Sequence, residues 1–167
     1  YGSMTCSGLC GLVMTGIQVA AGTYHTCAVA NGVVKCWGWN HVGQLGLGDT
    51  IDRGSAPNQM GAALPAVNLG SGRKASAVAV GWHHSCAVLD NGACKCWGSN
   101  VYGQLGLGQA TLYGDQPGEM GDALPEVDLG PGRKVLEVVA GEGHTCARLD
   151  DGSVKCWGAN TYGKLGQ

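Results

Sequence analysis

Cysteine and histidine recur together in this chain, and these side chains can form disulfides or bind metal ions. The cysteine pairs are Cys27 and Cys36, Cys86 and Cys96, and Cys146 and Cys156, and a histidine stands two residues before each first cysteine, at His25, His84 and His144. Because side chains two positions apart share one face of a strand, each histidine should lie beside the cysteine that follows it. The pattern therefore permits either a disulfide within each pair or a zinc site.

The residues between the paired cysteines favour disulfides. Asp90-Asn91-Gly92 lies midway between Cys86 and Cys96 and suits a three-residue hairpin loop that ends in a left-handed glycine. The first pair has one residue fewer, and Asn31-Gly32 is there the strongest signal for a two-residue hairpin turn. Both loops place the two cysteines opposite each other, at a non-hydrogen-bonded pair where side chains approach most closely. We favour three cross-strand disulfides over three pairs of reduced, buried thiols.

A metal site and an organic cofactor are not expected. Each copy supplies only three zinc ligands, and a fourth does not recur. Cys6 and Cys10, outside the repeats, can pair with each other. Cys94 has no counterpart, because Val34 and Val154 stand at the equivalent positions. Since Cys94 shares a strand face with Cys96, it is either a free thiol or a link to another chain.

A period of sixty residues organises the chain and predicts its fold. "LPAVNLGSGRK" at residue 64 returns as "LPEVDLGPGRK" at residue 124, and short apolar runs ending in glycine precede each cysteine pair. No stretch shows sustained helical periodicity. We expect four short strands per unit, in the second unit over residues 64–69, 76–80, 84–89 and 93–97. Such units bury their faces against one another, which favours an all-β, partial β-propeller over a β-solenoid.

The repeat also predicts the domain organisation. We expect residues 1–16 to form an N-terminal segment outside the repeat. Residues 17–167 should form about two and a half to three antiparallel blades, with repeat units over residues 17–75, 76–135 and 136–167. The chain starts at Tyr1 and stops inside the third glycine-rich motif, so we expect part of a longer protein or an arc whose open ends partners cover.

Charge and hydropathy exclude several classes of partner. The formal net charge is −2, without a cluster of basic residues, so nucleic acid is not an expected partner. No apolar run reaches the roughly 18–20 residues of a transmembrane helix, which leaves peripheral contact with a membrane complex open. Nine cysteines, most of them in regular pairs, indicate an oxidising compartment, either extracellular or an organelle lumen such as the endoplasmic reticulum or the thylakoid.

Residues 81–108, "GWHHSCAVLDNGACKCWGSNVYGQLGLG", resemble the regulator of chromosome condensation repeat. The family pattern has a Gly-x-x-His-Ser/Thr start, an Asp-Gly turn, a Trp-Gly and an Asn-x-x-Gly-Gln-Leu-Gly-x-Gly ending. The resemblance covers residues 17–167 in nearly three copies. It implies a seven-bladed propeller, of which this chain would be less than half. It also implies a structural hydrogen-bonding role for His25, His84 and His144.

The tryptophans fall into two groups. Three of them recur sixty residues apart and should pack between blades as core residues: Trp37, Trp97 and Trp157. Trp39 and Trp82 have no equivalents in the other copies, which makes them candidates for exposed contact residues. A second candidate docking surface lies in the uncharged N-terminal stretch and comprises Leu9, Leu12, Val13 and Met14.

Two motifs have simple structural interpretations. The "GQLGLG" segments follow no strand-to-helix switch and carry no phosphate-binding lysine, so we read them as turns. A long loop gathers five carboxylates, Asp115, Glu119, Asp122, Glu126 and Asp128, but the first copy has no carboxylate at the equivalent positions. A solvated acidic loop is therefore favoured over a calcium site.

Structural residues recur in this chain, whereas no reactive constellation does, so we do not expect an enzyme. The leading hypothesis is a non-catalytic protein–protein interaction scaffold or peripheral structural subunit of a larger assembly, in an oxidising compartment. One alternative, implied by the resemblance, is a guanine-nucleotide exchange factor for a small GTPase. The other is an exported propeller that binds or inhibits another protein or a glycan.

Overall fold

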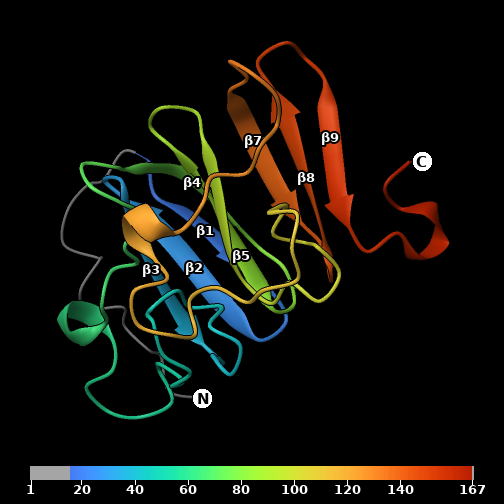
Figure 1. The fold of residues 1–167 in the computed structure, drawn as a ribbon. Coiled ribbons are helices and arrows are strands. Elements are labelled where there is room, and N and C mark those ends of the chain that lie inside the picture. Colours follow the sequence, from blue (N-terminus) through green and yellow to red (C-terminus); the bar gives the residue numbers. More distant parts are fainter. Residues whose placement is uncertain (1–15, 167) are drawn as a thin grey trace.

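Three antiparallel sheets follow one another along the chain in the computed structural model, which describes residues 16–166 (Figure 1). Blade 1 consists of β1 (Gln18–Ala21), β2 (His25–Ala30) and β3 (Val33–Gly38). Blade 2 consists of β4 (Ala75–Val80), β5 (His84–Leu89) and β6 (Cys94–Gly98). Blade 3 consists of β7 (Val135–Ala140), β8 (His144–Leu149) and β9 (Val154–Gly158). The expected all-β partial propeller is confirmed.

Local turn chemistry sets the hairpin register in each blade. Asn31 and Gly32 have φ angles of 52° and 82°, as a two-residue type I′ turn requires. In blade 2 the turn is one residue longer, and Gly92 takes the left-handed conformation at φ 84°. Both turns leave the cysteines paired across the hairpin, Cys27 with Cys36 and Cys86 with Cys96.

Each sheet has three strands, and the expected fourth strand at residues 64–69 is absent. The backbone of that segment bonds to blade 1 through one hydrogen bond of 2.8 Å from Val67 N to Val34 O on β3, and the side chain of Lys95 on β6 in blade 2 donates to the carbonyl of Leu69 at 3.1 Å. Val127 N donates in the same way to Cys94 O on β6, at 2.8 Å. A single bond makes no ladder, and Pro65, which lacks an N–H, cannot extend one. The segment's apolar side chains, including Leu64 and Leu69, are nevertheless buried.

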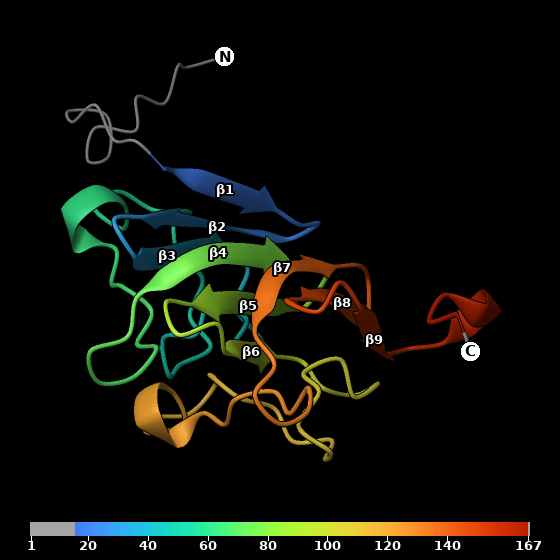
Figure 2. The same ribbon diagram turned by 90° about the horizontal axis from the view of Figure 1, so that it is seen from above.

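The first strands of the blades, β1, β4 and β7, follow one another in space (Figure 2). Glycine permits their close approach at the residue that directly follows each of these strands. A Cβ at Gly22 would collide with the carbonyl of Gly81, and a Cβ at Gly81 would collide with the carbonyl of Gly141 and the ring of His84. Backbone therefore packs on backbone where successive blades meet.

The hydrophobic core lies between blades and not within one sheet. One cluster joins blades 1 and 2 around Val34, Leu45, Leu89 and Trp97, and Trp97 is fully buried. A second cluster of buried residues joins blades 2 and 3, and Trp157 packs against it. Helical structure in residues 16–166 is limited to 3-10 turns over Gly61–Ala63, Gly121–Ala123 and Thr161–Gly163, and no helix there could cross a membrane.

Candidate protein-interaction surface

A hydrogen-bond chain joins blade 1 to blade 2. The ring nitrogen His25 Nε2 lies 2.7 Å from Ser85 Oγ, and Ser85 Oγ donates to the carbonyl of Gln44 at 2.9 Å. The indole nitrogen Trp97 Nε1 donates to the same carbonyl at 3.0 Å. Because the serine proton goes to the carbonyl, His25 must donate from Nε2.

The same chain of bonds recurs between blades 2 and 3. His84 Nε2 lies 2.9 Å from Thr145 Oγ1, which donates to the carbonyl of Gln104 at 2.8 Å, and Trp157 Nε1 donates to that carbonyl at 2.9 Å. Burial, with a smaller contribution from neighbouring histidines, lowers the pKa of His25 to about 4 and that of His84 to about 3. Both rings are therefore neutral near pH 7 and act as interblade donors, sealed from any substrate.

Each blade contains one disulfide: Cys27–Cys36, Cys86–Cys96 and Cys146–Cys156. The Cα atoms are 4.1 Å apart in all three, the close spacing of a non-hydrogen-bonded pair. Of the expected pairings, that of Cys6 with Cys10 lies outside the described residues, as do Leu9, Leu12, Val13 and Met14.

Cys94 is a free thiol that is completely buried, so it is not available as a link to another chain in this fold. Its sulfur lies 3.9 Å from Cys96 Sγ, on the strand face expected, and burial raises the pKa of Cys94 to about 12. Within the described residues, the only group with metal-ligand spacing is Cys86, Cys94 and Cys96. Two of these three sulfurs already share a disulfide, and none of the repeated histidines belongs to the group.

Carboxylates of the acidic loop accept hydrogen bonds from the backbone of the loop itself and from Ser71 in the preceding repeat. Glu119 accepts hydrogen bonds from the backbone N–H groups of Gly114 and Gln116 at 2.9 and 3.0 Å. Asp122 accepts from the backbone and the hydroxyl of Ser71, and these bonds lower the pKa of Asp122. In the first copy, Gln59 makes the contacts of Glu119 with an uncharged amide. The arrangement fits the solvated-loop interpretation.

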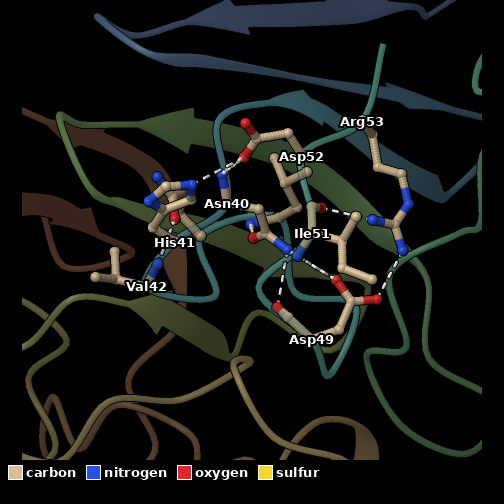
Figure 3. A network of polar contacts seen from close by, with 9 residues as sticks. Asn40, His41, Val42, Asp49, Ile51, Asp52 and Arg53 are labelled. Atoms are coloured by element: carbon tan, nitrogen blue, oxygen red, sulfur yellow. Dashed lines mark hydrogen bonds and ion pairs between the residues drawn. The ribbon is translucent and has the colours of Figure 1, made fainter. Parts of the chain in front are cut away.

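The glycine-rich loop after β3 is a turn whose polar groups bond to one another (Figure 3). Asn40 Nδ2 donates to the carbonyl of Asp49 at 2.8 Å, and Leu45 N donates to Asn40 Oδ1 at 2.9 Å. Arg53 forms an ion pair with Asp49 at 2.6 Å, and Asp52 accepts from Asn40 N at 2.8 Å. This network holds the backbone on both sides of Asn40 and so fixes the position of Trp39.

Aromatic rings from three separate loops meet at one end of blades 1 and 2, and we call this group the aromatic cluster. It comprises Tyr24 before β2, Trp39 and His41 after β3, and Trp82 and His83 before β5. Tyr24 and His83 stack with ring centroids 5.2 Å apart, and Trp39 lies 5.0 Å from His83 and 4.8 Å from His41. Trp82 meets the edge of His83 at 6.2 Å.

The aromatic cluster reaches solvent. Tyr24 is 50% exposed and Trp82 is 41% exposed, whereas Trp39 is half-buried. The structure thus connects the two candidate contact residues, Trp39 and Trp82, through His83. Sequence reasoning missed Tyr24 and His83. The signal was that this position of the repeat carries a ring in blades 1 and 2 but a glycine, Gly143, in blade 3.

A hollow of about 260 Å³ adjoins the aromatic cluster on the side of blade 3. Trp82, His83 and Tyr102 contribute aromatic surface, and Glu142 and Lys164 contribute opposite charges. Tyr102 is 63% exposed. The cluster and the hollow together form an aromatic surface with charged groups at its margin, a composition typical of protein-binding sites.

Comparison with known proteins identifies the repeat. Two family models, both described as the regulator of chromosome condensation (RCC1) repeat, match the chain, one at residues 17–44, 75–104 and 135–164 and the other at residues 31–88 and 91–148. The chain is 35% identical over 151 residues to the ultraviolet-B receptor UVR8 of Arabidopsis thaliana, covering 89% of this chain and 30% of the receptor. It is 34% identical to the human probable E3 ubiquitin-protein ligase HERC4, covering 90% of this chain and 13% of the ligase.

Solved structures show the same fold. Prp20p of Saccharomyces cerevisiae superposes with a TM-score of 0.63 at 23% identity, over 90% of this chain and 34% of the yeast protein. Human WBSCR16 superposes with a TM-score of 0.52 at 20% identity, over 93% of this chain and 50% of that protein. This chain thus spans less than a third of the two sequence relatives. The repeat models match more than half of the residues, and this match shows that the chain belongs to the regulator of chromosome condensation repeat family.

Proposed function

We propose that this chain is a non-catalytic protein–protein interaction module, a scaffold or peripheral subunit of a larger assembly, and that the aromatic cluster is its binding surface. The observation that carries the proposal is the meeting of Tyr24, Trp39, Trp82 and His83 at one exposed end of the blades. Tryptophan and tyrosine dominate binding hot spots because they bury a large rigid area and keep a polar group for hydrogen bonding.

The chemistry of the remaining polar groups supports a binding role. The buried histidines donate hydrogen bonds between blades, and the loop carboxylates hold backbone N–H groups. The aromatic rings, in contrast, are not needed to build a blade, since blade 3 has Gly143 and Ala159 at the positions of Tyr24 and Trp39. A surface that the fold does not require is a candidate for function.

An oxidising compartment, extracellular or an organelle lumen, is the proposed location. Three hairpin disulfides are expected to persist only where thiols are not continually reduced. Peripheral contact with a membrane-bound complex is compatible with this location. Among proteins of the same fold, Prp20p is described with binding properties to Gsp1p and histones, and a complex of Prp20 with Kap60 has been solved. We propose the same general role, protein binding, with a partner proper to this chain.

Site-specific photo-crosslinking tests the proposal. A photoreactive phenylalanine at Trp82 is compared with the same group at Tyr162, an aromatic residue that is fully exposed outside the aromatic cluster. Both proteins are produced in cells that export them to an oxidising compartment, and crosslinked products are identified by mass spectrometry. We expect one defined partner at position 82 and none at position 162. Equal products at both positions would contradict the proposal.

Affinity measurements with the crosslinked partner complete the test. Trp82→Ala should weaken binding about thirty-fold or more, the effect of losing a hot-spot residue, and Tyr162→Ala should leave it unchanged. Circular dichroism checks that both variants keep the sheet signal. Trp39→Ala, which removes the other tryptophan of the cluster, should weaken binding as well, and an unchanged affinity for both tryptophan variants would refute the role of the aromatic cluster.

Glycan binding is the alternative that the cluster itself favours, because aromatic rings also stack on sugar faces. A glycan array distinguishes the two functions, and the proposed function predicts no specific signal. Nucleotide exchange on a small GTPase, the other alternative, is tested by release of a fluorescent guanine nucleotide. We expect no acceleration of release.

A further inference from the structure

Blade 3 carries one half of the interblade hydrogen-bond chain, the histidine ring and the backbone carbonyl, and this half has no partner in the part of the chain that the structure describes. His144 occupies the position of His25 and His84, yet its Nε2 has no hydroxyl partner among the described residues. Lys164 occupies the position of Gln44 and Gln104, whose carbonyls each accept two bonds. The backbone carbonyl does the accepting, so the change from glutamine to lysine keeps this function.

The complementary half is unpaired at the start of blade 1. Thr26 follows His25 as Ser85 follows His84, and its hydroxyl makes no hydrogen bond within residues 16–166. Trp37 stands at the position of Trp97 and Trp157, and its indole N–H likewise has no acceptor in that part of the chain. Blade 1 therefore presents a hydroxyl and an indole N–H, the two donors that the carbonyl of Lys164 lacks. The same hydroxyl is the acceptor that the ring of His144 lacks.

Burial shows the same complementarity in apolar side chains. On the open face of blade 3, Val154 is 63% exposed, whereas its blade 2 equivalent, Cys94, is 0% exposed against blade 3. On the open face of blade 1, Val19 is 58% exposed, whereas its blade 2 equivalent, Val78, is 2% exposed against blade 1. The interfaces inside the chain bury the positions that the two open faces leave in solvent.

Polar groups on the first strands of the blades also fit a repeat of the interface between blades 1 and 2. Gln18 on β1 bonds to the backbone of blade 2, accepting from Val78 N at 2.8 Å and donating to Val78 O at 3.1 Å. On β7 its position is taken by Glu137, which forms an ion pair with Arg148 at 3.2 Å. The carboxylate can accept from a backbone N–H and the guanidinium can donate to a carbonyl, so the pair offers both bonds of a glutamine.

We propose that blade 3 of one copy docks on blade 1 of a second copy, head to tail, through an interface that repeats the one between blades 1 and 2. His144 Nε2 donates to the hydroxyl of Thr26 in the second copy, and that hydroxyl and the indole of Trp37 donate to the carbonyl of Lys164. Val154 and Val19 become buried. The interface is heterologous, because the two faces that meet are different surfaces of the chain.

Sedimentation velocity of the purified 167-residue chain over a wide concentration range tests this proposal. Val19→Lys and Val154→Lys each place a charge on one open face at an exposed position, so the isolated fold should tolerate them. Val101→Lys, at a position 65% exposed on a loop, is the matched control. We expect the parent chain and the control to associate, and each face variant to be at least a hundred-fold weaker in self-association.

A mixture of the two face variants gives the decisive result. The Val19→Lys chain keeps an intact blade 3 face, and the Val154→Lys chain keeps an intact blade 1 face. Head-to-tail docking therefore predicts that the mixture forms a heterodimer and nothing larger. A parent chain that stays monomeric at every concentration, as it would if another segment of the chain covered a face, overturns the proposal. So does a mixture that fails to associate while the parent chain does.

Discussion

Acidification from pH 7.5 to pH 5 should destabilise this fold through two buried histidines. His25 and His84 are 3% and 0% exposed, and burial lowers their pKa values from 6.5 to about 4 and about 3. Between these values and 6.5 the unfolded chain binds protons that the folded chain does not. The contribution of the two neutral histidines to the free energy of unfolding is therefore fully present above pH 6.5, and it is lost as the pH decreases toward the folded-state pKa values.

The magnitude follows from the two protonation states. At pH 5 an unfolded histidine is about 97% protonated, whereas folded His25 is about 10% protonated. The resulting loss is about 2 kcal/mol for each histidine and about 4 kcal/mol for both, a large part of the roughly 5–15 kcal/mol that stabilises an ordinary domain. Asp122 and Asp151 have lowered pKa values, so their protonation lies below this pH range.

Urea unfolding at pH 7.5 and pH 5, with the disulfides intact, measures this loss. His84→Gln keeps an N–H donor for Thr145 but removes the titrating ring, and we expect it to reduce the difference in free energy of unfolding between the two pH values by about 2 kcal/mol. Val101→Ala, at an exposed position, removes no titrating group and should leave the difference unchanged. Equal stability of the parent chain at both pH values would refute the reasoning, as would a His84→Gln variant with the full loss.

Three further predictions concern the cysteines and the glycine contacts. Replacing Cys86 and Cys96 together by serine should lower the free energy of unfolding by about 2–3 kcal/mol, the entropy of a ten-residue loop, as measured by urea unfolding; an unchanged value would contradict it. Gly81→Ala should lower the melting temperature more than Gly103→Ala, because its Cβ would overlap the His84 ring and the Gly141 carbonyl, whereas Gly103→Ala adds only the strain of an alanine at φ 75° with no atom within 4 Å of the new Cβ; equal shifts in differential scanning calorimetry would argue against the packing described. Cys94 should react with a thiol reagent only after unfolding, and rapid labelling of the native chain, absent in Cys94→Ala, would show that it is not buried.

Hairpin geometry was predictable from sequence because it depends on neighbouring residues. The conformations that Asn31 and Gly32 adopt are rare for other residues, and they set the register that puts Cys27 opposite Cys36. The sixty-residue period predicted stacked blades for a similar reason, since a small sheet cannot bury both of its faces alone.

Contacts between segments far apart in sequence needed the tertiary structure. Residues 64–69 look like a strand in isolation, but Val67 bonds to blade 1, because the available backbone edge there is that of β3. The ring of His25 finds Ser85 sixty residues away, and the repeated His-Ser/Thr pairs in the sequence were the only signal of it. No local pattern indicates that a ring and a hydroxyl of the same motif serve opposite faces of a blade.

The sequence by itself determined the repeat, the hairpin registers and the three disulfides, since each depends on turn chemistry within a dozen residues. The tertiary structure decided which residues form the aromatic cluster, the state of Cys94 and the pairing of one blade with the next. These features arise where three loops or two sheets meet, and only the packing angle between blades sets the distances there. Tyr24 and His83 stack because two blades bring their loops together, although 59 residues separate them along the chain.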